Sequence, residues 1–205
     1  GGQFVEAHEN LSRDLSCVGL SLKEIDADFF KKSLLDDSIF KVNKIEGQNR
    51  QGFVTDIVQS VTRKHTGIFA YEIQTGVESI KAFLKIKPHD REIVLGSAKV
   101  LEILNPGLAE LLVRRSEHLP FKHCHIREIE VLSKKNSIVN ELAPQFLGSF
   151  IDFNKEAFVL IQELIGDNWN ISEIINLDKW TDQAKENAIK KIARMHGHFL
   201  NQEAN

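Results

Sequence analysis

The sequence predicts an α+β fold with a five-stranded antiparallel sheet, because strand-like and helix-like segments follow one another in blocks. Residues 39–87 alternate apolar and polar side chains between short polar turns, which is typical of antiparallel strands in sequence order. Residues 91–136 then repeat their apolar side chains at helical spacing, and residues 144–166 return to the strand pattern. A last helical segment covers residues 181–200. This order differs from the regular βαβ alternation that builds a parallel sheet.

Composition excludes several classes of protein before any motif is considered. The chain has 205 residues, enough for one domain or for one domain and part of another. A net charge of −3 without long runs of Lys or Arg argues against a nucleic-acid partner. No apolar run approaches the ~18 residues of a membrane span. The two Cys have no CxxC spacing and fit reduced thiols, so we expect a cytoplasmic protein that binds neither nucleic acid nor membrane.

Residues 1–38 form an N-terminal segment in which we expect one amphipathic helix. Ser21 is the candidate N-cap, and Glu24 three residues later completes a capping box. The apolar side chains at helical spacing are Leu22, Ile25, Phe29, Phe30 and Leu34. They predict a single helix that begins at Ser21 and runs towards the first strand.

Strand-like segments fill the next part of the chain. They cover residues 39–47, 53–63, 68–74 and 78–87. The polar turn QNRQG, residues 48–52, separates the first two, and Pro88 ends the last. Gly52 lets the backbone turn tightly and approach a ligand, although an ordinary hairpin turn is the simpler interpretation of Gly52 alone.

Helical periodicity dominates three later segments. The first, residues 91–115, breaks at Asn105–Gly107 and belongs to a helical insert over residues 89–120. The second contains HIREIEVLSKKN, with one face formed by Ile126, Ile129 and Leu132. The third is capped by Thr181 or Asp182, and its apolar face contains Ala188, Ile189, Ile192, Met195 and Phe199. Between the second and third, two strands are joined by a polar turn at residues 152–155.

The stretch KAFLKIKP, residues 81–88, places lysines within a strand that we expect to be buried. Alternation separates Lys81, Phe83, Lys85 and Lys87 from Ala82, Leu84 and Ile86. A lysine that shares the core-facing side with Phe83 needs an anionic partner, because a lone buried ammonium is costly. Glu128 is the candidate partner of Lys85, whereas Glu130 points about 200° around the same helix. Taken alone, Lys85 fits an edge-strand lysine in water better than a buried one.

The ordered set of Gly52, Lys85 and Glu128 is similar to the nucleotide-binding lobe of the protein kinase fold. In that fold, a lysine on the third strand holds the α- and β-phosphates of ATP, and a helix glutamate pairs with it. AFLK stands where the fold has its VAIK-type strand, and HIREIEVL stands where it has the glutamate. The resemblance implies that Lys85 and Glu128 are catalytic and that Gly52 and Phe53 contact the nucleotide.

The segments after Glu128 resemble the aminoglycoside phosphotransferase and choline kinase-like family. FVLIQELIG, residues 158–166, is similar to the family's fifth strand and acidic hinge, and AIKKIARMHGHFL is similar to the helix after it. The resemblance implies that Ile161 holds the gatekeeper position. It also implies that the carbonyl of Gln162 and the N–H of Leu164 bind the adenine edge, with Glu163 between them. ATP and Mg²⁺ are the implied cofactors, and a small-molecule hydroxyl is the implied acceptor.

The sequence also departs from that family. The family's catalytic loop reads roughly HGDxxxxN, but His198 stands where its Asp would be and Glu203 where its Asn would be. We expect residues 39–165 to form the nucleotide-binding lobe, and residues 166–205 to form the hinge exit and first helices of an incomplete C-terminal lobe. On this expectation the chain is a fragment, its partner is the remainder of that lobe, and the Mg²⁺ ligands lie outside it. The last helix would then leave its apolar face uncovered.

Three functions remain open at this point. The first is an ATP-dependent phosphotransferase acting on a hydroxyl of a small molecule. The second is a kinase-like protein acting on a peptide, such as a natural-product precursor. The third is an inactive kinase-like module for binding or scaffolding. A catalytic loop of the HxDxxxxN type and a later Asp would favour the first two over the third.

A histidine-rich stretch, HLPFKHCHIRE, precedes Glu128 and raises the question of a metal site. The candidate ligands are His118, His123, Cys124 and His125. Their spacing matches no zinc pattern, so we predict no metal site. The simpler interpretation is that this stretch enters the helix that carries Glu128.

Overall fold

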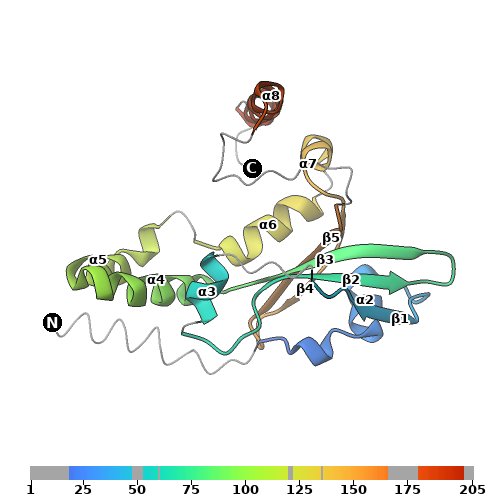
Figure 1. The fold of residues 1–205 in the computed structure, drawn as a ribbon, viewed down its shortest axis with the longest axis horizontal. Coiled ribbons are helices and arrows are strands. Elements are labelled where there is room, and N and C mark those ends of the chain that lie inside the picture. The colour runs from blue at the N-terminus through green and yellow to red at the C-terminus, as the bar shows by residue number, and fades with distance from the viewer. Residues whose placement is uncertain are drawn as a thin grey trace.

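The structure, a computed structural model, describes residues 19–47, 53–59, 61–119, 122–134, 136–165 and 180–200. Within these residues the fold is α+β, with an open antiparallel sheet in the order β1-β2-β3-β5-β4 (Figure 1). The strands are β1 (Lys41–Lys44), β2 (Gly67–Gln74), β3 (Ser79–Lys87), β4 (Phe146–Asp152) and β5 (Ala157–Glu163). The predicted α+β class and the five-stranded antiparallel sheet are confirmed, although the strand-like segment at residues 53–63 is not one of the five strands.

The register of the sheet determines which side chains share a face. Lys85 of β3 lies opposite Ile68 of β2 and Leu160 of β5. Residues paired directly across antiparallel strands share a face, and their sequence neighbours point the other way. Lys85 and Leu160 are therefore on one face, and Leu84 and Ile161 are on the other.

The face that carries Leu84 packs against helix α2 (Ala27–Leu34), which lies below the sheet in Figure 1. Phe29 and Phe30 of α2 belong to the same buried cluster as Leu84 and Ile161. The close approach of α2 to β4 depends on Gly148, because a Cβ there would collide with the carbonyl oxygen of Ser33. This cluster is the larger core of the sheet.

The face that carries Lys85 is covered by α6 (Cys124–Ser133) and α7 (Ser137–Leu142), on the opposite side of the sheet from α2 (Figure 1). Ile129 and Leu132 of α6 and Val139 of α7 pack on Phe158 and Leu160 of β5. The predicted helical face of this segment is thus confirmed. The apolar contacts hold α6 against the strand beside Lys85.

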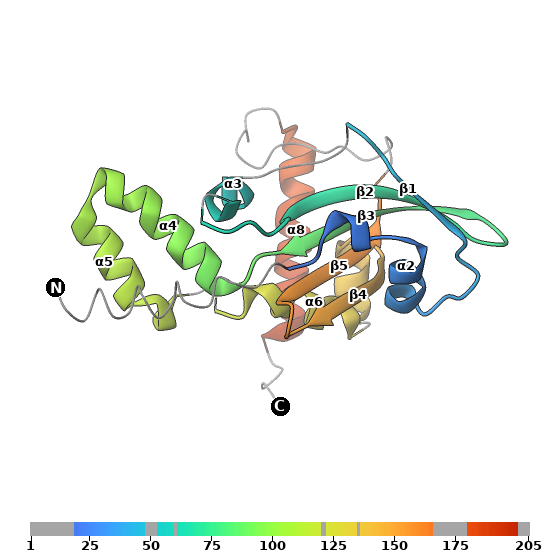
Figure 2. The same ribbon diagram turned by 90° about the horizontal axis from the view of Figure 1, so that it is seen from below.

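Helices α4 (Asp90–Leu104) and α5 (Pro106–Arg114) form a hairpin that projects from the sheet (Figure 2). The predicted break at Asn105 is confirmed, since its side chain accepts a hydrogen bond from the N–H of Leu108 at 3.2 Å and Pro106 begins α5. Val94, Ala98, Ala109 and Val113 form the core between the two helices. The 3₁₀ helix η2 (Ser116–His118) follows the hairpin.

The prediction of a strand over residues 53–63 is wrong, because the described part of this segment contains helix α3 (Phe53–Gln59). The segment is rich in residues that favour strands, but its apolar residues also recur at helical spacing. Packing decides between the two: Ile57 lies so close to Gly96 of α4 that a Cβ there would collide with it. Val58 is fully buried.

The N-terminal helix is divided into two elements. The predicted capping box is confirmed, with the Ser21 N–H donating to Glu24 Oε2 at 2.9 Å, but it caps only the 3₁₀ helix η1 (Leu22–Glu24). Asp26 then caps α2 by accepting from the Phe29 N–H at 2.9 Å. A second N-cap residue within the apolar pattern therefore starts a new helix.

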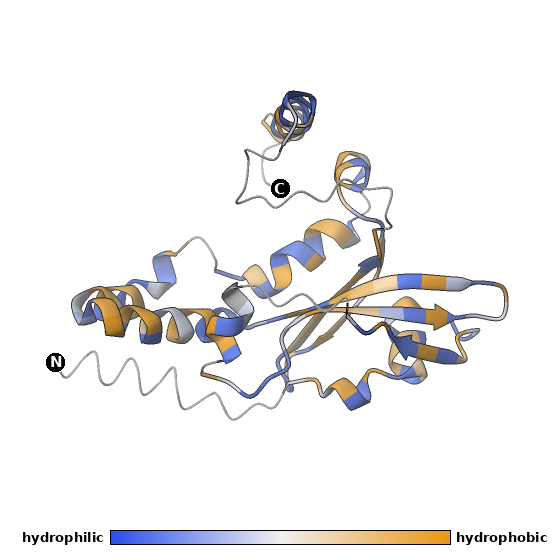
Figure 3. Ribbon diagram, viewed as in Figure 1, coloured by the Kyte–Doolittle hydropathy of each residue, from blue (hydrophilic) through white to orange (hydrophobic). Residues whose placement is uncertain are grey.

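Helix α8 (Asp182–Phe199) lies beyond α7 and away from the sheet (Figure 1). Thr181 caps it, as predicted, by accepting from the Ala184 N–H at 3.2 Å. Apolar and hydrophilic residues both occur along it (Figure 3), and Ile189 and Ile192 are 67% and 53% exposed. Among the helices that the structure describes, none combines the length and apolar character needed to cross a membrane.

Candidate functional site

Lys85 and Glu128 form the centre of the candidate site. The Lys85 Nζ lies 2.7 Å from Glu128 Oε2 and 2.9 Å from Oε1, so the ammonium contacts both carboxylate oxygens. The predicted ion pair between β3 and α6 is confirmed. Glu130, the weaker candidate, is exposed.

Two periodic patterns bring these side chains together. Alternation along β3 directs Lys85 and Lys87 to the face that α6 covers. In α6, Ile129 is buried against the sheet, and Glu128 is the adjacent residue, about 100° around the helix. Glu128 therefore lies at the rim of the contact between helix and sheet, where it reaches β3.

Lys87 is a site residue that the sequence did not predict. Its Nζ contacts Glu128 Oε2, the same oxygen that Lys85 contacts. The side chain of Lys87 is 9% exposed, whereas that of Lys85 is 36% exposed. We refer to Lys85, Lys87 and Glu128 as the charge triad.

Electrostatics favour the ionised form of Glu128. Burial by itself would raise the pKa of this carboxyl, but hydrogen bonds from Lys85 and Lys87 and their charges outweigh burial and hold the pKa below its usual value. With both lysines protonated, the triad has two positive charges and one negative charge. The site is therefore suited to an anion.

A pocket of about 380 Å³ adjoins the triad. Its lining residues are Arg127, Glu128, Val131, Leu132, Ala143, Pro144 and Gln162. Gln162 closes one side, where its Nε2 donates to the Pro144 carbonyl at 2.9 Å. Among the described residues that line it, Glu128 belongs to the charge triad, Arg127 carries a positive charge, and Val131, Leu132, Ala143 and Pro144 are apolar.

The predicted hinge contacts are not all compatible with the structure. The Leu164 N–H donates to the Lys81 carbonyl at 2.9 Å, so it is engaged by the sheet rather than available to adenine. Ile161, the predicted gatekeeper, is fully buried on the α2 side and therefore does not share the face of Lys85. Because Gln162 lies opposite Phe83, it shares the Lys85 face.

The other predicted site residues are Glu163, Gly52 and Phe53. Glu163 pairs with Gln145, the residue before β4: its N–H donates to the Gln145 carbonyl at 2.9 Å, and its Oε1 accepts from the Gln145 N–H at 3.2 Å. Gly52 lies outside the described residues, and Phe53 begins α3 instead of a strand. The predicted turn between two strands therefore leads into a helix.

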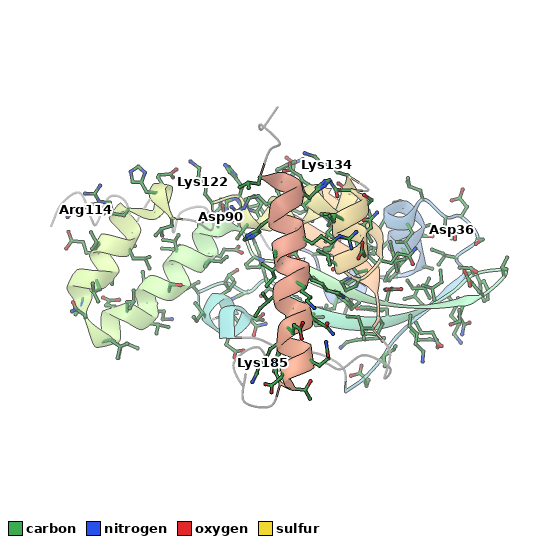
Figure 4. The ribbon with its side chains drawn as sticks, turned by 90° about the horizontal axis from the view of Figure 1, so that it is seen from above. Asp36, Asp90, Arg114, Lys122, Lys134 and Lys185 are labelled. Carbon is green, nitrogen blue, oxygen red and sulfur yellow. The ribbon has the colours of Figure 1, made fainter. Side chains whose placement is uncertain are left out.

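Asp90, the first residue of α4 and labelled in Figure 4, contacts three residues of the histidine-rich stretch through its carboxylate. One carboxylate oxygen of Asp90 lies 2.8 Å from His125 Nδ1 and accepts from Cys124 Sγ at 3.2 Å, and the other accepts from the His123 N–H. Burial and the hydrogen bond to Asp90 raise the pKa of Cys124 to about 11. Asp90 thus joins the beginning of α4 to the beginning of α6.

No group of three or more His, Cys, Asp or Glu side chains that could hold a metal ion occurs within the described ranges. His125 is buried instead in aromatic contacts, with ring centroids 4.4 Å from His89 and 4.5 Å from Phe158. These contacts and Asp90 account for the burial of His125 at the start of α6.

A second charged cluster, formed by Lys64, Arg91, Glu92 and Glu156, lies at the start of α4 and was not predicted. The Lys64 Nζ is 2.5 Å from Glu92 Oε1 and 2.7 Å from Glu156 Oε2, and Arg91 contacts the other oxygen of Glu156. Lys64 and Glu92 are buried. This cluster joins the loop before β2, the start of α4 and the β4–β5 turn. No local pattern in the sequence marks it, because its members come from three distant segments.

Comparison with protein-family models, with curated proteins and with solved structures finds no match to this chain.

Proposed function

We propose that the charge triad binds the phosphates of ATP and that the chain is the nucleotide-binding part of a phosphotransferase of the aminoglycoside and choline kinase-like type. The acceptor of the full protein is a hydroxyl group of a small molecule. The observation that carries this proposal is the ion pair between Lys85 on the third strand and Glu128 on the helix packed against the sheet. In kinases, a lysine paired with a glutamate in this way holds the α- and β-phosphates of ATP.

The charge of the triad supports phosphate as the ligand. An ammonium has three donors, so Lys85 can contact Glu128 and a phosphate oxygen at once. Hydrogen bonds between ionised partners are about twice as strong as neutral ones. The side chain of Lys85 is 36% exposed, so a ligand can reach part of it.

The site fits the phosphates of ATP better than it fits a metal ion. The described residues offer two ammonium groups at the triad and an adjoining pocket with apolar walls from Val131 and Leu132. They offer no cluster of metal ligands. When bound, Mg²⁺ neutralises charge on the phosphates, and no residue described here is assigned to it.

A second candidate function is anion binding without phosphotransfer. It is favoured by the hinge, because the Leu164 N–H is occupied by Lys81 and Ile161 faces away from the site. A module of this kind would bind phosphate groups without recognising adenine.

Calorimetric titration of the 205-residue chain with ATP and Mg²⁺, with adenosine and with inorganic triphosphate distinguishes these functions. We expect ATP to bind more tightly than triphosphate, and Lys85→Met to weaken both by about tenfold or more, which matches the loss of one charge-assisted hydrogen bond. Adenosine binding should be unchanged, because it has no phosphate for Lys85 to meet.

Lys81→Met is the matched control, since Lys81 is an exposed lysine on the same face of β3. It should change ATP affinity by less than about twofold, as expected for a screened surface charge. Equal binding of ATP and triphosphate without adenosine binding would favour the second candidate. If the wild-type chain binds none of the three ligands, both candidates are wrong.

A further inference from the structure

Lys87 differs from Lys85 in one respect that matters for the site. Both ammonium groups contact Glu128 Oε2, but the side chain of Lys87 is 9% exposed and that of Lys85 is 36% exposed. Lys87 lies at the end of β3 opposite Phe158, which is fully buried. Its position leaves little surface for contact with a ligand.

A buried ammonium requires an anionic partner. Within the described part of the chain, Glu128 is the carboxylate that contacts Lys87. Lys87 therefore depends on Glu128 more than Lys85 does, since the side chain of Lys85 is more exposed to water than that of Lys87.

A ligand phosphate would create a problem for an isolated pair of Lys85 and Glu128. The phosphate and the Glu128 carboxylate are both anions that would compete for one ammonium and repel each other. A second cation on Glu128 removes that competition. The carboxylate then keeps a partner when Lys85 turns part of its donor capacity to the phosphate.

We propose that Lys87 is a positioning residue of the phosphate site, holding Glu128 against β3 so that Lys85 remains paired and still free to bind the ligand. This inference rests on the proposed function, because it assigns Lys85 to the phosphate. Lys87 acts through Glu128 and does not touch the ligand.

The effect of Lys87 on the pKa of Glu128 can be measured without any ligand. Carboxyl ¹³C NMR, with the Glu128 signal assigned from Glu128→Gln, gives the pKa of this carboxyl in each variant. Lys87→Met should raise the Glu128 pKa more than Lys85→Met, since charges interact more strongly away from water. Lys87→Gln provides a second, more polar replacement in case the first fails to fold. A Glu128 pKa unchanged by loss of Lys87 would overturn the inference.

A double-mutant cycle on ATP affinity tests whether Lys87 acts through Glu128. Lys87→Met should weaken ATP by about tenfold in the wild-type background, comparable to one charged hydrogen bond. In the Glu128→Gln background, the same replacement should change ATP affinity by less than about twofold. An equal loss in both backgrounds would show that Lys87 contacts the phosphate directly and would overturn its role as a positioning residue.

The two measurements separate this inference from the proposed function. If the wild-type chain binds no ATP, the proposed function is wrong, and the NMR titration still decides whether Lys87 holds Glu128. If ATP binds and depends on Lys85 but not on Lys87, the proposed function stands and the role of Lys87 is refuted.

Discussion

Lys64→Met tests whether the charged cluster at the start of α4 stabilises the fold. The change removes the ammonium that lies 2.5 Å from Glu92 and 2.7 Å from Glu156. Met keeps most of the length and apolar character of the lysine stem. The variant therefore removes a charge while leaving a small cavity at most.

The expected loss of folding stability depends on which contacts the Glu92 and Glu156 carboxylates keep in the variant. Glu156 retains its contact with Arg91, but Glu92 is fully buried and Lys64 is its ionic partner. Removing one member of a buried ion pair costs about 3–5 kcal/mol, because the other charge stays buried and uncompensated. We expect Lys64→Met to lower the free energy of unfolding by about 3 kcal/mol or more.

Urea unfolding followed by circular dichroism gives this free energy. Lys31→Met is the matched control, since Lys31 forms an exposed pair with Asp28 at 3.5 Å and should lose no more than about 1 kcal/mol. The double variant Lys64→Met with Glu92→Gln should recover part of the loss, because Gln leaves no buried charge. A loss of about 1 kcal/mol or less for Lys64→Met would refute the reasoning.

Two further predictions concern pH and the misassigned hinge residue. Burial and the charges of His125 and Arg91 lower the pKa of His89 from 6.5 to about 4, so the unfolded chain takes up a proton in that window and the folded chain does not. The free energy of unfolding should therefore fall as pH drops from 6.5 to 4. His89→Asn keeps a side chain that can cap α4, and thermal unfolding at several pH values should show a weaker pH dependence for this variant. An unchanged pH dependence would contradict the prediction. Ile161→Ala should lower the free energy of unfolding in urea by about 2–5 kcal/mol, because Ile161 is fully buried. The ATP affinity of the folded variant should stay within about twofold of wild type. A selective loss of ATP binding would instead place Ile161 at the site.

The parts of the fold that local periodicity encodes were predictable from the sequence. Alternation in KAFLKIKP and the helical spacing around Glu128 placed Lys85 and Glu128 on surfaces that face each other. The caps at Ser21 and Thr181 were equally readable, because they depend on residues within one turn. Asp26 shows the limit of this reasoning, since a second cap divided a segment that apolar spacing alone presented as one helix.

The features that were missed depend on long-range packing. The register between β3 and β5 decides that Gln162, and not Ile161, shares the Lys85 face, and no local pattern specifies that register. Helix α3 was predicted as a strand because its β-branched residues favour strands, but the packing of Ile57 on Gly96 of α4 stabilises a helix instead. Alternation placed Lys87 on the same strand face as Lys85, but nothing in the sequence identified it as a partner of Glu128.

The central claim is that Lys85 binds a nucleotide phosphate while Glu128 remains paired. A crystal structure of the chain with Mg²⁺ and a non-hydrolysable ATP analogue tests it most directly. The account predicts phosphate oxygens within hydrogen-bonding distance of the Lys85 Nζ, with Glu128 still in contact with Lys87 and the nucleotide on the Gln162 side of the sheet. A nucleotide bound elsewhere, with Lys85 and Glu128 paired as before and no phosphate near either lysine, would contradict it.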